Sequence, residues 1–126
     1  MAFAPASLTL SAAEARVLGQ LNEVRASVGL PALGLEAGLV DSARAQAGRI
    51  SSAGSLFHQD LHPLLGAWGT AGENVGYGPD VEVVHGALVG SPGHYANMVN
   101  GSFSHVGVAV TTSPDGRVWV AQVFAG

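Results

Sequence analysis

The apolar positions in the first part of the chain recur at the period of an α-helix. Ser11 and Glu14 have the spacing of a capping box, and we expect the helix that they open to run to about Val28. Gly29 ends this helix and Pro31 prevents it from resuming. Its apolar stripe consists of Val17, Leu21, Val24 and Val28.

A second helical stripe follows an extended segment at residues 30–35. Glu36 is a plausible helix start and Gly54 the end of this helix. Leu33 and Leu35 alternate toward the gap between the two helices, so we expect both helices to pack on a common core. The stripe of the second helix consists of Leu39, Val40, Ala43, Ala47 and Ile50.

The middle of the chain changes its pattern several times. Residues 55–72 follow neither the helical nor the strand period, and we interpret them as a functional loop. Residues 73–77 read as a short strand, after which Asp80 is the expected N-cap of a helix that reaches about Val89. Its apolar side consists of Val81, Val84 and Leu88. Ser91 and Pro92 suit the start of a further short helix, which carries His94, Asn97 and Met98.

The last third alternates between apolar and small or polar residues. Residues 106–111 and 118–124 are predicted to be two strands, and the turn between them is formed by residues 113–116. Helices followed by a terminal hairpin indicate an α+β fold in which helices cover an antiparallel sheet. We expect an N-terminal arm at residues 1–10 and a single domain at residues 11–126.

Composition narrows the possible functions. The chain has 126 residues, of which 48% are hydrophobic and only 11% are charged, so it has the material for one packed core. All five basic residues are arginines without a cluster, which argues against nucleic acid as a main partner. The absence of cysteine excludes disulfides, thiol nucleophiles and Cys-ligated metals.

No apolar segment of the sequence reaches the roughly 18–20 residues that span a bilayer. The first ten residues lack the basic and apolar regions of a signal peptide. A signal peptide removed upstream of Met1 would leave the same sequence.

Three ionisable residues are the candidates for chemistry: His58, Glu73 and His94. Two imidazoles and a carboxylate suit a divalent metal with water in the open position, or acid–base catalysis. Their spacing matches no local ligand motif, so structural roles stay open. His58 could bond the carbonyls at a helix end, Glu73 could bond backbone amides, and His94 could be satisfied inside the core.

The remaining polar and aromatic candidates favour structural roles. His62, His85 and His105 each lack a second group that would define a task, and we expect His85 on a solvated helix face. Ser91 and Ser102 lie near His94 in sequence but not in a nucleophile elbow, and no glycine-rich phosphate loop is present. We expect core or cleft-wall positions for the aromatic residues Trp68, Tyr77 and Trp119.

Several short segments also carry a family likeness. They are Leu21-Asn22-Glu23-Val24-Arg25, Phe57-His58, Gly72-Glu73-Asn74-Val75, Ser91-Pro92-Gly93-His94-Tyr95-Ala96-Asn97-Met98, Phe103-Ser104-His105-Val106-Gly107-Val108 and Trp119-Val120-Ala121-Gln122-Val123-Phe124. In this order they resemble the CAP superfamily of cysteine-rich secretory, antigen 5 and pathogenesis-related 1 proteins, in particular its cysteine-free, SCP-like bacterial branch. The resemblance covers residues 14–126.

The resemblance implies a three-layer α-β-α sandwich with a small antiparallel sheet and a cleft lined by a His, Glu, Glu, His tetrad. His58, Glu73 and His94 match three members, while residues 88–91 contain no acid for the second glutamate. The cleft would also include Ser91, Asn97 and Gln122. His58 and His94 would be the metal ligands, binding zinc or another divalent cation weakly, with affinity that fades below about pH 6 because imidazole must be neutral to ligate.

The resemblance further implies an exported protein, secreted or in the cell envelope, that acts as a non-enzymatic binding module. We expect a monomer whose cleft takes a divalent metal, a small apolar molecule, a peptide or an envelope component. One alternative is a metal-assisted hydrolase of peptides or esters, with Glu73 as general base. Another is a purely structural role for the three residues.

Overall fold

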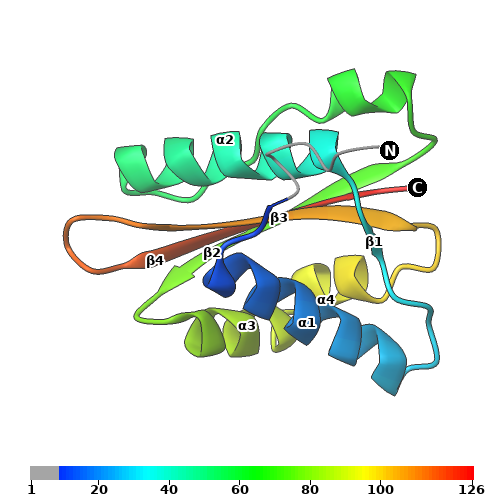
Figure 1. Ribbon diagram of the computed structural model, residues 1–126, viewed down its shortest axis with the longest axis horizontal. Coiled ribbons are helices and arrows are strands. Elements are labelled where there is room, and N and C mark those ends of the chain that lie inside the picture. Colours follow the sequence, from blue (N-terminus) through cyan, green and yellow to red (C-terminus); the bar gives the residue numbers. More distant parts are fainter. Residues whose placement is uncertain (1–8) are drawn as a thin grey trace.

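Helices cover both faces of one four-stranded sheet in the computed structural model, which describes residues 9–126 (Figure 1). The strands are β1 (Gly34–Leu35), β2 (Ala71–Gly78), β3 (His105–Thr112) and β4 (Val118–Ala125), in the spatial order β1-β3-β4-β2. One face is covered by α2 (Ala37–Ala53) and a 3₁₀ helix (His62–Gly66), and the other by α1 (Ala12–Ser27), α3 (Val81–Val89) and α4 (Pro92–Met98). This confirms the α-β-α sandwich. Apart from its last two residues, the arm predicted at residues 1–10 lies outside the described part of the chain.

The helix ends follow the local signals of the sequence. Ser11 Oγ accepts a hydrogen bond from the Glu14 amide, and Glu14 Oε1 accepts one from the Ser11 amide, so the predicted capping box is formed. Gly54 ends α2 in the left-handed conformation, at φ 68°, where glycine is the residue least strained.

None of the helices between residues 9 and 126 is long and apolar enough to cross a membrane.

The sheet is mixed rather than wholly antiparallel. β4 pairs antiparallel with both β3 and β2, and the β3–β4 turn closes on Gly116 at φ 87°, as its sequence predicts. The extended segment before α2, however, contains the short strand β1, which pairs parallel with β3 through Gly34 and His105. A two-residue strand is too short to show a period in the sequence, and only the pairing with a distant segment defines it.

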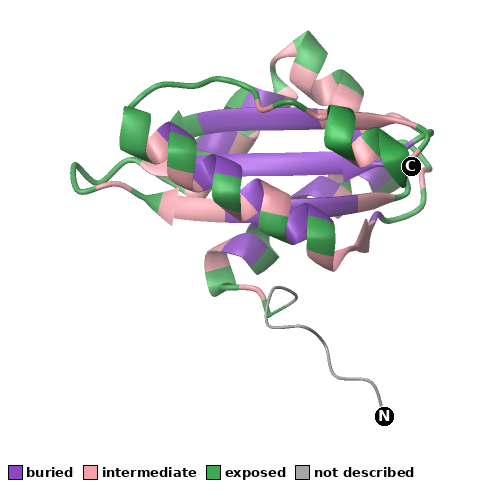
Figure 2. Ribbon diagram, turned by 90° about the horizontal axis from the view of Figure 1, so that it is seen from above, coloured by how far each residue is buried: buried purple, intermediate pink, exposed green. Residues whose placement is uncertain are grey.

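The hydrophobic core has two parts, one on each face of the sheet. Leu39, Ala43, Ala47 and Ile50 of α2 pack with Val75, Ala109, Trp119, Ala121, Val123 and Ala125 of the sheet. Val17 and Leu21 of α1 belong to the opposite cluster, so the expectation that these two helices share a core was wrong. A helical stripe shows which side of a helix is buried but not which element covers it. Figure 2 shows the buried centre of the sheet.

The predicted loop at residues 55–72 and the predicted apolar stripe of the first helix also differ from the structure. Residues 55–72 were interpreted as a loop, yet they contain the 3₁₀ helix and the first two residues of β2. In the first helix, Val28 is exposed as the C-cap, while Arg25 is buried. Arg25, which lies outside the expected apolar stripe, is buried because its guanidinium donates to four carbonyl oxygens.

His85 lies half-buried between α1 and α3, although the sequence predicted a solvated face. It lines a narrow, filled crevice, together with Val17, Gln20, Val81, Val84, Leu88, Val120 and Gln122. Burial lowers the pKa of His85, while nearby Glu23 and Glu82 oppose this shift and Arg16 supports it.

This environment predicts a pH dependence of stability. Because the pKa of His85 is lower in the folded than in the unfolded state, the unfolded chain binds the proton first as the pH falls through about 6.5. The free energy of unfolding should therefore fall below that pH, until the folded state is protonated too. His85→Gln should remove this part of the loss, measured by urea unfolding at several pH values between about 7.5 and 5. Identical pH profiles for the two proteins would contradict it.

Candidate functional site

The candidate site lies along β2, the strand at one edge of the sheet. Thr70 and Gly126 exchange two backbone hydrogen bonds, so even-numbered residues of this segment face β4 with their backbone groups. The backbone carbonyl of Glu73 therefore points out from the edge. Successive side chains of a strand alternate, so Glu73 and Asn74 lie on opposite faces. Glu73 shares the α2 face with Val75, and Asn74 faces the layer of α1, α3 and α4.

The Glu73 carboxylate is buried and accepts hydrogen bonds on both oxygens. Oε1 lies 2.8 Å from Nδ1 of His58 and 3.2 Å from the backbone nitrogen of Gln59. Oε2 accepts from the Gln59 side-chain Nε2 at 2.7 Å. The Glu73 side chain is 1% exposed, whereas that of His58 is 61% exposed. The carboxylate thus holds an imidazole whose other side faces solvent.

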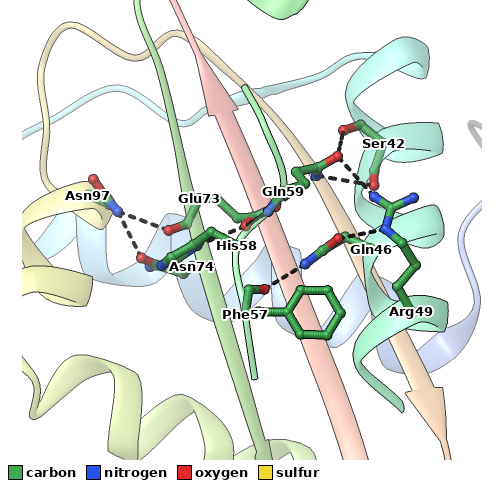
Figure 3. Close-up of polar contacts among 9 residues, drawn as sticks. All are labelled: Ser42, Gln46, Arg49, Phe57, His58, Gln59, Glu73, Asn74 and Asn97. Atoms are coloured by element: carbon green, nitrogen blue, oxygen red, sulfur yellow. Dashed lines mark hydrogen bonds and ion pairs between the residues drawn. The ribbon is translucent and has the colours of Figure 1, made fainter. Parts of the chain in front are cut away.

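Gln59 is the residue of this site that the sequence did not reveal. It lies between Glu73 and two side chains of α2, Ser42 and Arg49, as Figure 3 shows. A second contact from α2 fixes the same loop, because Gln46 donates to the carbonyl of Phe57 at 2.6 Å. The only signal in the sequence is the position of Gln59 directly after His58.

His94 belongs to the opposite layer and is held by different partners. Its Nδ1 lies 2.8 Å from Ser91 Oγ, so this hydroxyl bonds the ring and does not cap α4, although Ser91 is at the expected N-cap position. The side-chain amide of Asn74 donates to the carbonyl of His94 at 3.0 Å and to Gln122 Oε1 at 3.1 Å. Ser91, His94 and Gln122 are therefore connected through one polar network.

Asn97 of α4 joins its helix to β2 at the sheet edge. Its Nδ2 donates to Asn74 Oδ1 at 2.9 Å and to the outward-pointing carbonyl of Glu73 at 3.3 Å (Figure 3). The structure thus brings His58 and Glu73 into direct contact. The link to His94 runs only between backbone carbonyls, those of His94 and Glu73, through the side chains of Asn74 and Asn97.

These contacts limit the atoms that are available to bind a metal ion. With Nδ1 of His58 bonded to Glu73 and Nδ1 of His94 bonded to Ser91, each ring has only Nε2 left as a metal ligand. Within residues 9–126 no group of three or more His, Cys, Asp or Glu side chains could hold one ion. At most one nitrogen of each imidazole is therefore left for an ion.

The other candidate side chains lie in local contacts. His62 bonds Asp60 on the surface, and the ring of His105 lies 5.2 Å from that of Trp68. Trp119 is buried, as expected, and stacks on the exposed Tyr77 with ring centroids 4.9 Å apart. Neither histidine contacts Glu73 or His58 through a hydrogen bond of the described residues.

Comparison with known proteins agrees with this architecture. The profile of the CAP family, described as the cysteine-rich secretory protein family, matches residues 18–124. The chain belongs to the CAP family. A curated relative, the uncharacterized protein YkwD of Bacillus subtilis (strain 168), is 33% identical over 129 residues, covering 94% of this CAP domain and 49% of the relative. The chain therefore spans about half the length of that relative.

Solved structures share the fold of this CAP domain at low identity. An outer surface protein from Borrelia burgdorferi superimposes with a TM-score of 0.79 and 17% identity, covering 88% of this chain and 90% of that protein. An extracellular protein from Bacillus anthracis str. Ames that contains an SCP domain gives a TM-score of 0.76 and 20% identity, covering 89% of this chain and 39% of that protein. Both bacterial neighbours are thus described as surface or extracellular proteins.

Proposed function

We propose that this CAP domain is an exported, non-enzymatic binding module, and that its ligand contacts the exposed imidazole of His58. The observation that carries the proposal is the contact between His58 Nδ1 and the buried carboxylate of Glu73. A buried acceptor that holds one side of an imidazole leaves the other side as a fixed, solvent-facing group. Such a group suits recognition of a ligand.

The same contact argues against a hydrolase with Glu73 as general base. A general base must lie within hydrogen-bond reach of the water that it deprotonates. Both oxygens of Glu73 already accept from His58 or Gln59, and the side chain is 1% exposed. The carboxylate is thus placed to orient a ring, not to meet a substrate.

The ligand classes that fit are a divalent cation, a small apolar molecule, a peptide or a component of the envelope. Two imidazoles without an acidic ligand favour weak metal binding, because each ring contributes one nitrogen and water completes the sphere. A related fold, NaASP2, was solved with Zn²⁺ and superimposes with a TM-score of 0.70 at 15% identity. Export is supported by the surface and extracellular descriptions of the bacterial neighbours.

Native mass spectrometry of the purified domain tests the proposal. After incubation with lipid extracts, envelope fractions or Zn²⁺, the wild-type protein should carry added mass, and the His58→Ala, His94→Ala double variant should lose it. The substitutions remove both Nε2 atoms but leave the carboxylate and the amide network.

A matched variant, His62→Ala, changes an exposed histidine that bonds Asp60 on the surface. It should bind like the wild-type protein. Absence of any adduct on the wild-type protein, or equal binding by the double variant, would refute the proposal. Peptide or ester turnover that a chelator removes and Glu73→Gln abolishes would establish the hydrolase instead.

A further inference from the structure

The turn after α4 contains the one asparagine of the chain that precedes a glycine, Asn100. Asn100 is half-buried, while Gly101 and Ser102 are exposed. Gly101 has no Cβ to shield its backbone nitrogen, and among residues 9–126 its N–H has no hydrogen-bond acceptor. An unhindered backbone nitrogen therefore lies next to the side-chain amide of Asn100, which it could attack.

The two oxygens that would gain negative charge in such an attack both accept hydrogen bonds. Loss of the proton from the Gly101 nitrogen spreads charge onto the backbone oxygen of Asn100, because the peptide group is conjugated. Arg25 Nη1 donates to this oxygen at 3.0 Å, and the backbone amide of Phe103 donates to it at 3.2 Å.

The second oxygen is Oδ1 of the Asn100 side chain, which would become negative once Cγ is attacked. It accepts from the backbone amide of Ser102 at 2.8 Å, the arrangement in which an asparagine side chain folds over the chain that follows it. Fixed donors aimed at the atoms where charge develops lower the barrier of a reaction. The turn thus holds donors for both charges.

We propose that Asn100 is a self-modification site, at which the folded turn promotes conversion of asparagine to aspartate or isoaspartate with water as the only co-reactant. The Gly101 nitrogen gives its proton to solvent and forms a bond to Asn100 Cγ. The bond from Cγ to Nδ2 breaks, and Nδ2 takes a proton from water and leaves as ammonia. Water then opens the resulting succinimide at either carbonyl, and nothing is oxidised or reduced.

The modification acts on the end of α4. In isoaspartate the main chain is longer by one carbon, and the backbone carbonyl that Arg25 holds becomes a free carboxylate. Arg25 also donates to the carbonyl of Met98, so the reaction changes a residue beside the anchor of the helix that carries His94. No ligand takes part, and the inference therefore stands apart from the proposed function.

A second turn of the same chain provides a matched comparison. Asp115 precedes Gly116, and Asp115 Oδ1 accepts from the backbone amide of Arg117 at 3.1 Å, as Asn100 does from the residue two positions ahead. Here, however, the Gly116 N–H donates to the carbonyl of Ser113 at 2.9 Å. Asp115→Asn thus gives a second asparagine–glycine pair in which the attacking nitrogen is held by a hydrogen bond.

Peptide mass spectrometry of the Asp115→Asn protein after incubation near neutral pH compares the two positions in one molecule. Exchange of the amide NH₂ for OH raises the mass, and fragment spectra locate the change. In the folded protein, residue 100 should react about ten-fold faster than residue 115, and about ten-fold faster than it does in the same chain unfolded in urea. In urea the two positions should react at similar rates, because the hydrogen bonds that distinguish them are lost.

Gly101→Ala tests the attacking nitrogen. The added methyl group would lie 3.8 Å from Leu30 Cδ2, an ordinary contact, so the turn can keep its shape. The variant should lose most of the product at residue 100. Three results would overturn the inference: slower reaction of residue 100 in the folded protein than in urea, equal rates at residues 100 and 115 in the folded protein, or a folded Gly101→Ala protein with the original rate.

Discussion

Gly107→Ala should lower the free energy of unfolding by about 3 kcal/mol or more, since it forces a methyl group against the backbone of a packed helix. Gly107 lies in β3 on the face that α2 covers. A Cβ added there would overlap the backbone of Leu39 and Val40. Backbone atoms cannot rotate away as a side-chain tip does, so α2 would have to lift from the sheet. Urea unfolding of the two proteins measures the loss.

Gly48→Ala in α2 is the matched control. A Cβ at that position meets nothing within 4 Å, and alanine is favoured over glycine inside a helix by about 0.5–1 kcal/mol. The same substitution should therefore stabilise the domain at residue 48 and destabilise it at residue 107. Equal effects at the two positions would show that the backbone of α2 does not lie in contact with Gly107 of β3.

The close approach at Gly107 was not visible in the sequence, and neither was the assignment of α1 and α2 to opposite faces. Both depend on which segments meet in space, whereas the signals read correctly were local. Ser11 and Glu14 are three residues apart, and the turn that Gly116 closes spans four residues. The parallel pairing of β1 with β3 joins segments about 70 residues apart, as Gly34 and His105 show.

The candidate site, too, was predictable from the sequence only in part. His58 and Glu73 were placed together by resemblance to a family, and the structure brings them into contact. Gln59 and Arg49 escaped prediction because polar residues in a loop or on an exposed helix face show no period. They reach Glu73 only because α2 and the loop after it meet in space, which the sequence pattern does not show.

Arg25→Met should be comparably damaging, with a loss of about 3 kcal/mol or more in the free energy of unfolding, because it removes four hydrogen bonds from one charged donor, two of them buried. The Arg25 guanidinium is buried and donates to four carbonyls, those of Pro31, Met98, Asn100 and Phe103. Methionine fills similar space but donates nothing. Burial lowers the pKa of Arg25, as expected for a cation paired with carbonyls rather than with a carboxylate.

The loss of these hydrogen bonds should loosen α4 first, because the last carbonyl of this helix, that of Met98, is one of the acceptors. Hydrogen exchange should accelerate relative to the wild-type protein, and the increase should be larger in residues 95–103 than in β4. That difference would report loosening of the helix that carries His94. Arg16→Met is the control, because Arg16 forms an exposed pair with Glu82 at 2.7 Å, and such pairs contribute about 1 kcal/mol or less. If the two arginine variants were equally stable, the four carbonyls would have found other donors, and Arg25 would not be the link between α1 and α4.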